Sequence, residues 1–578
     1  MSGTTIKPGG VILIIGFAAA IVGFGVYAYQ KEKNPTPPVT NNGGGSGSGS
    51  NNGGAATNGG GTTGGGEAGG EVLGGTTQKE FKEVGRAGAP QLSVPKGSYA
   101  WDDANPTVVF PINIWAGWGP IIAANDGFAP GSPRSVFKKY GFNVELRLID
   151  DPVQTAEAYA SGQAHTMWGT LDMIALFAPE LKKVGLTPKV FQQVDWSQGG
   201  DGIVVRSSIR SVKDLAGKTI ALCQNSPSHY YILRLLADVG LSHRDVNFRF
   251  TQTAFGASAL FAQDPRVHAC VSWAPDIYTL TETNKSVRLL STTADAANVI
   301  ADVWAARPDF ASDHPDVIKG LVKGIFEGVD LLAQNPDRVA ALMASGYHFP
   351  VDECKGMLGD AYSTGLADNV QFFDKGNAAG FAATWESAVD LYGKYGAVAN
   401  PVSADEVLDT SAVMGLKGEN AFPHQTAQKI GFTPPKLDLG SVEMSESEEI
   451  LRVTHRIQFE ANASKLDEKV DPTLPDTLKK IESLAKRFSG AMIIIEGNVD
   501  TSKRSQFNAM GARVMAKMSE RVQQLSQERA DSVRAALLKK FPGEDNRFVA
   551  IGNGWDNPID LVHHEKNRRV DVRVVRVE

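Results

Sequence analysis

The sequence predicts an α/β protein of several domains that follow one N-terminal apolar segment. Three observations predict this class. The chain has 578 residues, too many for one hydrophobic core. Strand-like apolar runs alternate with helical patterns from about Thr107 to Val398 and again after Glu448. Stretches rich in Gly, Ser, Asn and Pro separate these blocks from one another.

The first expected element is a transmembrane helix within residues 1–30. The stretch from Gly9 to Tyr29 is uncharged and almost wholly apolar, and about 20 such residues span a bilayer. A cleaved signal peptide is the alternative, because the stretch is N-terminal and contains small residues. Its length favours an uncleaved span, and the flanking lysines leave the orientation open.

Two linkers are expected, at residues 31–95 and 401–445. The first is dominated by Gly, Ser and Asn, so it predicts a flexible tether. Its glycines are not phosphate loops, since no strand precedes them and no helix follows. The second linker is inferred from recurring Pro, Gly and Ser.

The block from 96 to 400 predicts parallel sheets covered by helices, with enough elements for two lobes. Helix 226–240 has a capping serine, Ser226, a proline next to it and a terminal glycine, Gly240. A further helix cap is expected at residues 242–246. The other expected elements are strands 107–114, 142–149 and 269–273, helices 135–141 and 152–162, and a short helix and strand within 211–222.

The block from 446 to 578 predicts a compact α/β domain. Its first helix places Leu474, Leu478, Ile481, Leu484 and Phe488 on one stripe.

Composition and charge argue against several classes of function. A net charge of −7 without a basic tail argues against nucleic acid as a partner. Three cysteines, Cys223, Cys270 and Cys354, match no zinc or redox spacing and are expected to be buried free thiols. We expect no enzyme, catalytic residue, cofactor or metal; the His-rich stretch 562–567 is interpreted as a solvated loop.

Five C-terminal motifs resemble the OmpA-like peptidoglycan-binding family, in the family's order. They are "IQFEANASKL", "IIIEGNVD", "LSQERADSVRAALL", "IGNGWDNPI" and "NRRVDVRV". The resemblance implies that Asp500 and Arg529 grip the diaminopimelate of the peptidoglycan stem peptide, with Asn567 and Arg568 beside them. Asp500 would take the ammonium group and Arg529 the carboxylate. A turn-capping aspartate is the alternative for Asp500.

Ser526 is expected to cap the helix that carries Arg529. The sequence departs from the family pattern at Asn498 and Val499, where the family has His and Thr. The 29 positions from Asp500 to Arg529 (529 − 500) exceed the family's spacing, and the excess resembles additional helix.

Residues from Thr107 to Val398 resemble periplasmic substrate-binding proteins of the nitrate, sulfonate and taurine type. The motifs are "INIWAGWGPIIAANDGF", "YASGQAHTMWGTLDM", "SVKDLAGKTIAL" and "VHACVSWAPD". The resemblance implies a two-lobed, type II binding-protein fold. His165 and His268 replace the family's usual acidic residues.

That architecture predicts a solute site in a cleft, where strand ends meet helix N-termini that suit anions. Arg206 and His229 could contribute to binding the anion. Core packing is the alternative for the tryptophans, and simple capping for the serines. The expected solute-binding residues are Trp115, Trp118, Gly169, Thr170, Asp172, Ser226, Ser228, Trp273 and Asp276.

The sequence therefore predicts a membrane-anchored, cell-wall-attached solute receptor. It would capture a small anion or organic acid, of the phosphate, nitrate or sulfonate class, for an ABC transporter permease or for sensing. The expected localisation is the inner membrane, with a single pass and the bulk of the chain in the periplasm. The alternative is a structural or docking protein whose binding fold no longer takes a solute.

Overall fold

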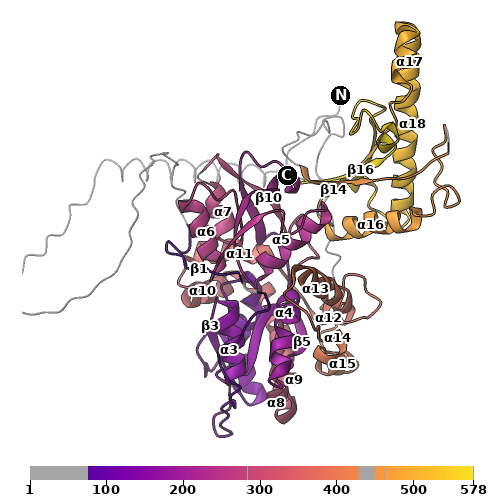
Figure 1. Ribbon diagram of the computed structural model, residues 1–578. Helices are drawn as coiled ribbons and strands as arrows, with labels where there is room; N and C mark the ends of the chain where they lie inside the picture. Colours follow the sequence, from indigo (N-terminus) through magenta and orange to yellow (C-terminus); the bar gives the residue numbers. More distant parts are fainter. Residues whose placement is uncertain (1–75, 87, 283, 428–448, 461, 577–578) are drawn as a thin grey trace, which may run out of the picture. The chain divides into compact units, whose positions relative to one another are not determined.

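The computed structural model describes residues 76–86, 88–282, 284–427, 449–460 and 462–576 (Figure 1). Within these ranges no helix is both long and apolar enough to cross a bilayer. The two longest, α9 (Pro315–Gln334) and α18 (Ala512–Leu538), carry charged residues along their length. The predicted localisation, a single-pass inner-membrane protein, is therefore corrected. The segment Gly9 to Tyr29 lies outside the described residues.

The first lobe is built on two sheets. A four-stranded antiparallel sheet has the order β12-β5-β11-β4, and β2 and β3 form a parallel pair. The pair lies beside β4, where the N–H of His165 donates to the carbonyl of Val109. The strands are β2 (Thr107–Ile112), β3 (Asn143–Leu148), β4 (Thr166–Thr170), β5 (Lys189–Ser197), β11 (Ala301–Ala306) and β12 (Ala361–Ser363).

The second lobe is a six-stranded mixed sheet with the order β1-β8-β7-β9-β6-β10. Only β8, β7 and β9 are parallel neighbours, so the predicted purely parallel sheets are corrected to mixed ones. Antiparallel pairs arise where the chain crosses between lobes, from β5 to β6 and from β10 to β11. The strands are β1 (Glu83–Val84), β6 (Asp201–Arg206), β7 (Thr219–Cys223), β8 (Asn247–Thr251), β9 (Ala269–Trp273) and β10 (Val287–Thr292).

Helices cover both lobes (Figure 1). The 3-10 helices are η1 (Ala116–Trp118), η2 (Val136–Tyr140), η3 (Val212–Leu215) and η4 (Leu358–Asp360). The α-helices are α2 (Gly119–Asn125), α3 (Pro152–Ser161), α4 (Leu171–Lys183), α5 (Pro227–Asp238), α6 (Ala254–Gln263), α7 (Asp276–Glu282), α8 (Pro308–Asp313), α9, α10 (Pro336–Tyr347), α11 (Val351–Met357), α12 (Leu366–Phe372), α13 (Phe381–Tyr395), α14 (Ala404–Val407) and α15 (Ser411–Gly418).

Local sequence accounts for the ends of these helices. Asp151 caps α3 by accepting from the N–H groups of Val153 and Gln154, and Gly162 ends it at φ 80°. α5 begins after Ser226 as predicted, but the Ser226 hydroxyl donates to the Cys223 carbonyl instead of capping the helix. The helix expected after residues 242–246 does not form, because the Asp245 carboxylate folds back onto Ser242 in a turn.

The described parts of both predicted linkers contain folded elements. β1 lies within the first one and pairs with β8, and α14 and α15 lie within the second. Leu408 forms a bridge to Val190 of β5, and Val407, Val413 and Leu416 are buried in the same core. The buried apolar side chains, not the Pro and Gly content, therefore decide where the domain ends.

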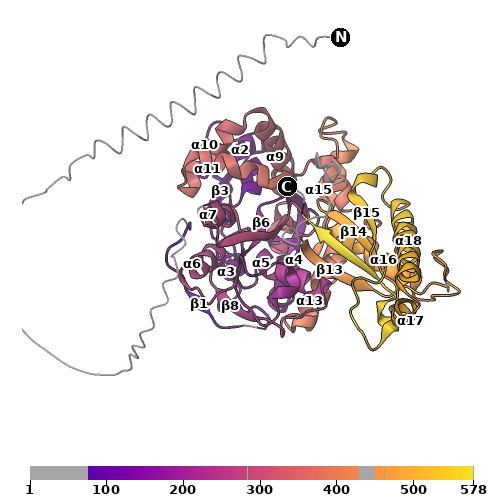
Figure 2. The same cartoon turned by 90° about the horizontal axis from the view of Figure 1, so that it is seen from above.

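The C-terminal domain is a four-stranded sheet in the order β13-β16-β14-β15, packed with α16 and α18 (Figure 2). In α16 the predicted stripe is buried at Leu474, Ile481 and Leu484, with Phe488 just beyond. The elements are β13 (Glu449–His455), α16 (Leu474–Arg487), β14 (Met492–Gly497), α17 (Arg504–Ala509), α18, η7 (Asp545–Arg547), β15 (Phe548–Gly552), η8 (His564–Asn567) and β16 (Val570–Val575).

α18 corrects one prediction about this domain. The helix begins at Ala512, so Ser526 lies in its interior and cannot cap it. The residues before Ser526 are mostly strong helix formers, and nothing breaks the helix there. The Ser526 hydroxyl instead donates to the Gln523 carbonyl and accepts from the N–H of Gly554, which ties the helix to the loop after β15. The predicted additional helix is confirmed.

Candidate functional site

The two lobes meet along a closed interface beside their crossovers, called the cleft below. Three side chains bridge it: Trp273 Nε1 donates to the Ile114 carbonyl (3.0 Å), the Tyr278 hydroxyl to Asp360 (2.8 Å) and Gln252 Nε2 to Asp151 (2.8 Å). The first partner in each bond belongs to the second lobe. Two-lobed binding folds open and close by hinge motion, and these contacts hold the closed form.

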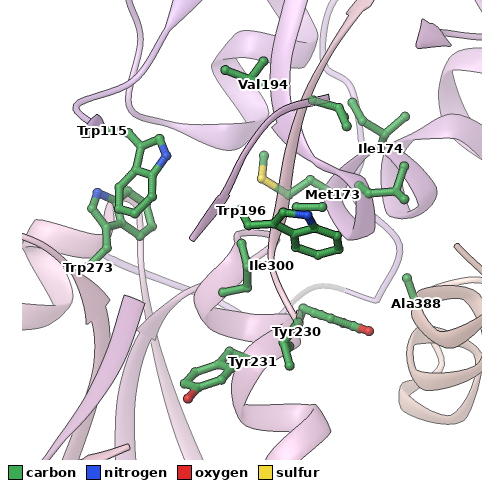
Figure 3. Packing of buried hydrophobic residues seen from close by; sticks show 14 of the residues in the cluster. Trp115, Met173, Ile174, Val194, Trp196, Tyr230, Tyr231, Trp273, Ile300 and Ala388 are labelled. Atoms are coloured by element: carbon green, nitrogen blue, oxygen red, sulfur yellow. The ribbon is translucent and has the colours of Figure 1, made fainter. Parts of the chain in front are cut away.

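Trp115 and Trp273, two of the predicted solute-binding residues, lie at this closed interface. Trp115 Nε1 donates to Asp195 (3.3 Å), and its carbonyl accepts from the Tyr347 hydroxyl (2.8 Å). Figure 3 draws the indoles of Trp115 and Trp273 next to each other, on the same side of Trp196. Their contact with a solute stays a prediction.

Other candidates lie in the protein core. Trp118 is fully buried against Phe110, and its Nε1 donates to Asn113 (2.7 Å). Arg206 donates to the carbonyls of Phe261 and Val267, at the edge of the second lobe. Neither reaches the cleft, so both are corrected to structural roles. An aromatic residue in an apolar run does not reveal from sequence which way it points.

His229 is also a core residue. Its ring is surrounded by aromatic rings, including those of Phe250, Tyr392 and Tyr395. Burial lowers the pKa of His229 to about 3, so the imidazole is neutral and cannot supply a charge to an anion.

Gly169, Thr170 and Asp172 lie where β4 gives way to α4, and all are buried. The Tyr392 hydroxyl donates to Asp172 (3.1 Å). Burial raises the pKa of Asp172 to about 7. Gly169 packs close to Ile174: a Cβ there would lie 3.1 Å from its Cδ1. These residues position polar groups at the start of a helix.

Ser226 precedes α5 and Ser228 lies in its first turn, and both are fully buried. The Ser228 hydroxyl has no hydrogen-bond partner among the described residues.

Asp276 starts α7, and its Oδ1 accepts from the N–H (2.7 Å) and hydroxyl (2.5 Å) of Thr77. Burial raises the pKa of Asp276 to about 6. Asp276 therefore holds the segment that precedes β1.

Sequence reasoning missed a group of buried carboxyls in the cleft. They are Asp195 in β5, Asp201 at the start of β6, Asp302 in β11 and Asp360 in η4. A usable signal was present: an aspartate inside the apolar run that becomes β5, and another after the glycine pair that follows it. A charged residue inside an apolar strand is costly and requires a partner or a function.

Burial without a cationic partner raises the pKa of each of these carboxyls. It raises the pKa of Asp195 and of Asp201 to about 7, and that of Asp360 to about 6. Burial, followed by the neighbouring carboxylate of Asp195, raises the pKa of Asp302 well above its usual range. Asp195 and Asp302 oppose each other in the sheet, and a hydrogen bond between them lowers the pKa of Asp195 and raises that of Asp302.

The two histidines that replace acidic residues have matching roles. His165 Nδ1 accepts from the N–H of Val109 (2.9 Å), and His268 Nδ1 accepts from the N–H of Thr219 (3.3 Å). Each imidazole binds a backbone N–H of a neighbouring strand, as a carboxylate oxygen could. These replacements therefore leave the cleft untouched and give no reason to infer a lost ligand site.

In the C-terminal domain Asp500, Arg529 and Arg568 are brought together. Asp500 Oδ2 accepts from Arg568 Nε (2.6 Å), and its Oδ1 accepts from the N–H of Ser502 (3.0 Å). Hydrogen bonds from Ser502 and Arg568 outweigh burial and lower the pKa of Asp500. Burial, together with nearby Arg568, lowers the pKa of Arg529, whereas Asp500 acts in the opposite direction. The three charges thus share one small region.

Two contacts hold the Arg529 side chain in place. Its Nε donates to the Ala463 carbonyl (3.0 Å), and its guanidinium lies over the Phe459 ring at 4.7 Å. Asn567 is different from the prediction: its Oδ1 accepts from the N–H of Ile559, and its Nδ2 donates to the Asp560 carbonyl. Asn567 is buried and braces a loop, so its role is corrected to positioning.

The described residues contain no group of three or more metal-ligating side chains that could hold an ion. Nδ1 of His564, in the His-rich stretch, instead lies 2.7 Å from the Thr501 hydroxyl. The three cysteines are free and buried, as predicted.

Comparisons with known proteins agree with this architecture. Residues 133–339 match the family model described as NMT1/THI5 like, and residues 458–571 match the OmpA family. The taurine-binding periplasmic protein of Escherichia coli (strain K12) is 27% identical over 200 residues, which are 35% of this chain and 61% of that protein. The match thus spans less than two thirds of that relative.

Solved structures are more distant. The alkanesulfonate-binding protein of Xanthomonas axonopodis pv. citri has 17% identity and a TM-score of 0.42, over 54% of this chain and 100% of that chain. The nitrate-binding protein of Synechocystis PCC 6803 has 13% identity and a TM-score of 0.44, over 56% and 91%. A desulfurization enzyme is also among these structures, with a TM-score of 0.40.

The two lobes form an α/β fold like that of periplasmic binding proteins, followed by a small α/β domain. More particularly, the chain joins a region similar to the NMT1/THI5-like family (residues 133–339) to a region similar to the OmpA family (residues 458–571).

Proposed function

We propose that this protein captures a small solute in its cleft, for ABC-type transport or sensing, while its C-terminal domain grips peptidoglycan. The matched families support both halves of the proposal. The relative named for taurine supports a solute of the sulfonate, nitrate or organic-acid class. An ABC transporter permease would then be the partner that receives the solute.

One observation carries the solute-binding half. The closed cleft contains buried polar atoms without a hydrogen-bond partner among the described residues, from both lobes. They include Asp360 Oδ2 of the first lobe and Asp201 Oδ1 of the second. Buried polar groups are normally satisfied, and each orphan is expected to have a function. A bound solute would supply the missing partners.

The proposal is tested by a thermal-shift screen of the full chain with taurine, aliphatic sulfonates, nitrate, sulfate and phosphate. A solute that binds only the folded state raises the melting temperature as its concentration passes the dissociation constant. We expect at least one saturable shift. A flat response to every solute would favour the alternative, a docking protein with an empty cleft.

The peptidoglycan half rests on the cluster of Asp500, Arg529 and Arg568. The Nη groups of Arg529 have no acceptor recorded among the described residues, so they are available for a ligand carboxylate. Arg568 is mostly exposed, and its bond to Asp500 can be exchanged for a ligand ammonium group at small cost. A carboxylate and two guanidinium groups thus suit a zwitterion such as diaminopimelate.

Replacing Arg529 with alanine is expected to lower the affinity for purified peptidoglycan sacculi at least 10-fold in co-sedimentation, because a charge-assisted bond is lost. Arg534→Ala is the matched control: it lies in the same helix, but its guanidinium donates to the carbonyls of Phe548 and Asp545. Unchanged sedimentation of the Arg529 variant, with both variants folded by circular dichroism, would contradict the assignment.

A further inference from the structure

A segment that we call the strap, residues 77–86 and 88–101, connects the two lobes before β2 begins. Its first part lies on the second lobe. The N–H (2.7 Å) and hydroxyl of Thr77 donate to Asp276 of α7, and β1 pairs antiparallel with β8. β1 is thereby the edge strand of the six-stranded sheet. At this end the strap is part of the second lobe.

Side chains strengthen this attachment. Arg249 of β8 donates to Glu83 (2.9 Å), and Gln263 of α6 donates to the Lys79 carbonyl (2.6 Å). Phe81 packs against an apolar cluster of the second lobe. An ion pair, a hydrogen bond to the backbone and an apolar contact therefore fix the strap to this lobe, in addition to the strand pairing.

The other part of the strap lies on the first lobe. The N–H of Ser93 donates to Glu157 (2.9 Å), and the N–H of Gly97 donates to the Ala160 carbonyl (3.0 Å), both in α3. Arg307, which is fully buried, donates to the Gly97 carbonyl (2.8 Å). One continuous stretch of chain is therefore anchored on both lobes.

The part of the strap between these two ends is also held in place. The guanidinium of Arg86 lies over the Tyr395 ring at 4.9 Å from its centroid. Pro90 is buried, and Leu92 packs against the main core. Because the strap is in contact with the protein along its course, a movement of the lobes apart must break contacts at one of its ends.

The strap also binds a residue that bridges the lobes. The N–H of Gln252 donates to the Lys82 carbonyl (3.0 Å), and the Thr253 hydroxyl donates to Gln78 (2.8 Å). The Gln252 side chain in turn donates to Asp151 of the first lobe (2.8 Å). The backbone of Gln252 thus holds the strap while its side chain holds the closed lobes, so each attachment should stabilise the other.

We propose that the strap is a latch on the closed form of the two lobes, and that its release from the second lobe lets them open. Only the consequence for solute rests on the proposed function, because the latch itself is a property of the fold. A solute held between latched lobes leaves only when they open. The strap would therefore set the time for which a bound solute is retained.

A double substitution in the full chain, Phe81→Ser with Glu83→Arg, tests the latch. It removes the apolar contact and places a second positive charge beside Arg249, while the first-lobe end of the strap stays unchanged. Glu80→Arg is the control. It makes the same charge change in the strap at an exposed side chain for which no ion pair is recorded among the described residues.

Spin labels on the two lobes measure their separation without any solute. The three native cysteines are buried, so labels can be attached through Ser208→Cys in the second lobe and Ala333→Cys in the first, both at exposed positions. In pulsed electron–electron resonance we expect a short distance in the wild-type background. The ratio of long to short distances should rise about 10-fold in the strap variant, because an apolar contact and an ion pair are lost. Glu80→Arg should leave the distances unchanged.

Solute release gives a second measurement. In stopped-flow fluorescence, with Trp115 and Trp273 at the lobe interface as reporters, the strap variant should release the best solute from the thermal-shift screen about 10-fold faster, in proportion to the change in opening. If the double variant does not fold, Glu83→Arg alone replaces it.

The outcomes distinguish the latch from the proposed function. Equal distances in the strap variant and its control, or no short distance in the wild-type background, would overturn the latch and leave the solute receptor intact. Failure of every solute to bind would overturn the receptor, while the spin-label distances would still decide whether the strap holds the lobes closed.

Discussion

Replacing Asp201 with asparagine is expected to stabilise the solute-free protein at pH 8 and to leave its stability almost unchanged at pH 4. Burial raises the pKa of Asp201 to about 7 in the folded protein, while an unfolded aspartate has a pKa of about 3.9. The folded state therefore binds the proton more tightly. The stability that this proton contributes is present below about pH 4 and is lost as the pH rises through about 7.

At pH 8 the buried carboxylate costs about 4 kcal/mol, which asparagine avoids. We expect the melting temperature to rise by about 5 °C or more at pH 8 in differential scanning calorimetry. Histidines that titrate in this range are present in both proteins, so they do not change the difference between the two melting temperatures. Asp316→Asn is the control and should show no pH-dependent difference. Destabilisation at pH 8, or equal effects at both pH values, would show that the carboxylate is compensated.

Replacing Gly200 with leucine is expected to weaken solute binding at least 100-fold while the protein stays folded. A Cβ at this position would lie 2.5 Å from Cζ3 of Trp115 and 2.9 Å from Cβ of Asp360. Trp115 cannot easily move, because Asp195 and Tyr347 hold both its ends. The added side chain would therefore keep the first lobe from closing onto the crossover.

The size of this effect follows from the fraction of molecules that can adopt the closed state. If the closed, binding-competent state falls to about 1% of molecules, the apparent affinity falls about 100-fold. Titration calorimetry with the best solute from the thermal-shift screen measures it, and circular dichroism checks the fold. Gly356→Leu is the control, since a Cβ there meets nothing within 4 Å. Wild-type affinity in the Gly200 variant would show that solute binds without the closure seen here.

Short-range features could be read from the sequence alone. The glycine that ends α3, the apolar stripe of α16 and the five motifs of the C-terminal domain depend on residues a few positions apart. Asp500 and Arg529 were predicted as partners, and the structure brings them together with Arg568. One local feature was not predicted. The residues near Ser526 gave no sign that the helix containing it begins at Ala512.

Only the tertiary structure decided which way side chains point and which distant residues meet. Asp195 and Asp302 are 107 positions apart (302 − 195) yet opposed across two strands. Trp118 and His229 were candidates by type, but packing placed both in the core. Strand register and lobe closure are long-range properties, and they alone turn isolated aspartates into one site. The sequence by itself determined the order of domains and elements; the contacts between them determined the chemistry of the cleft.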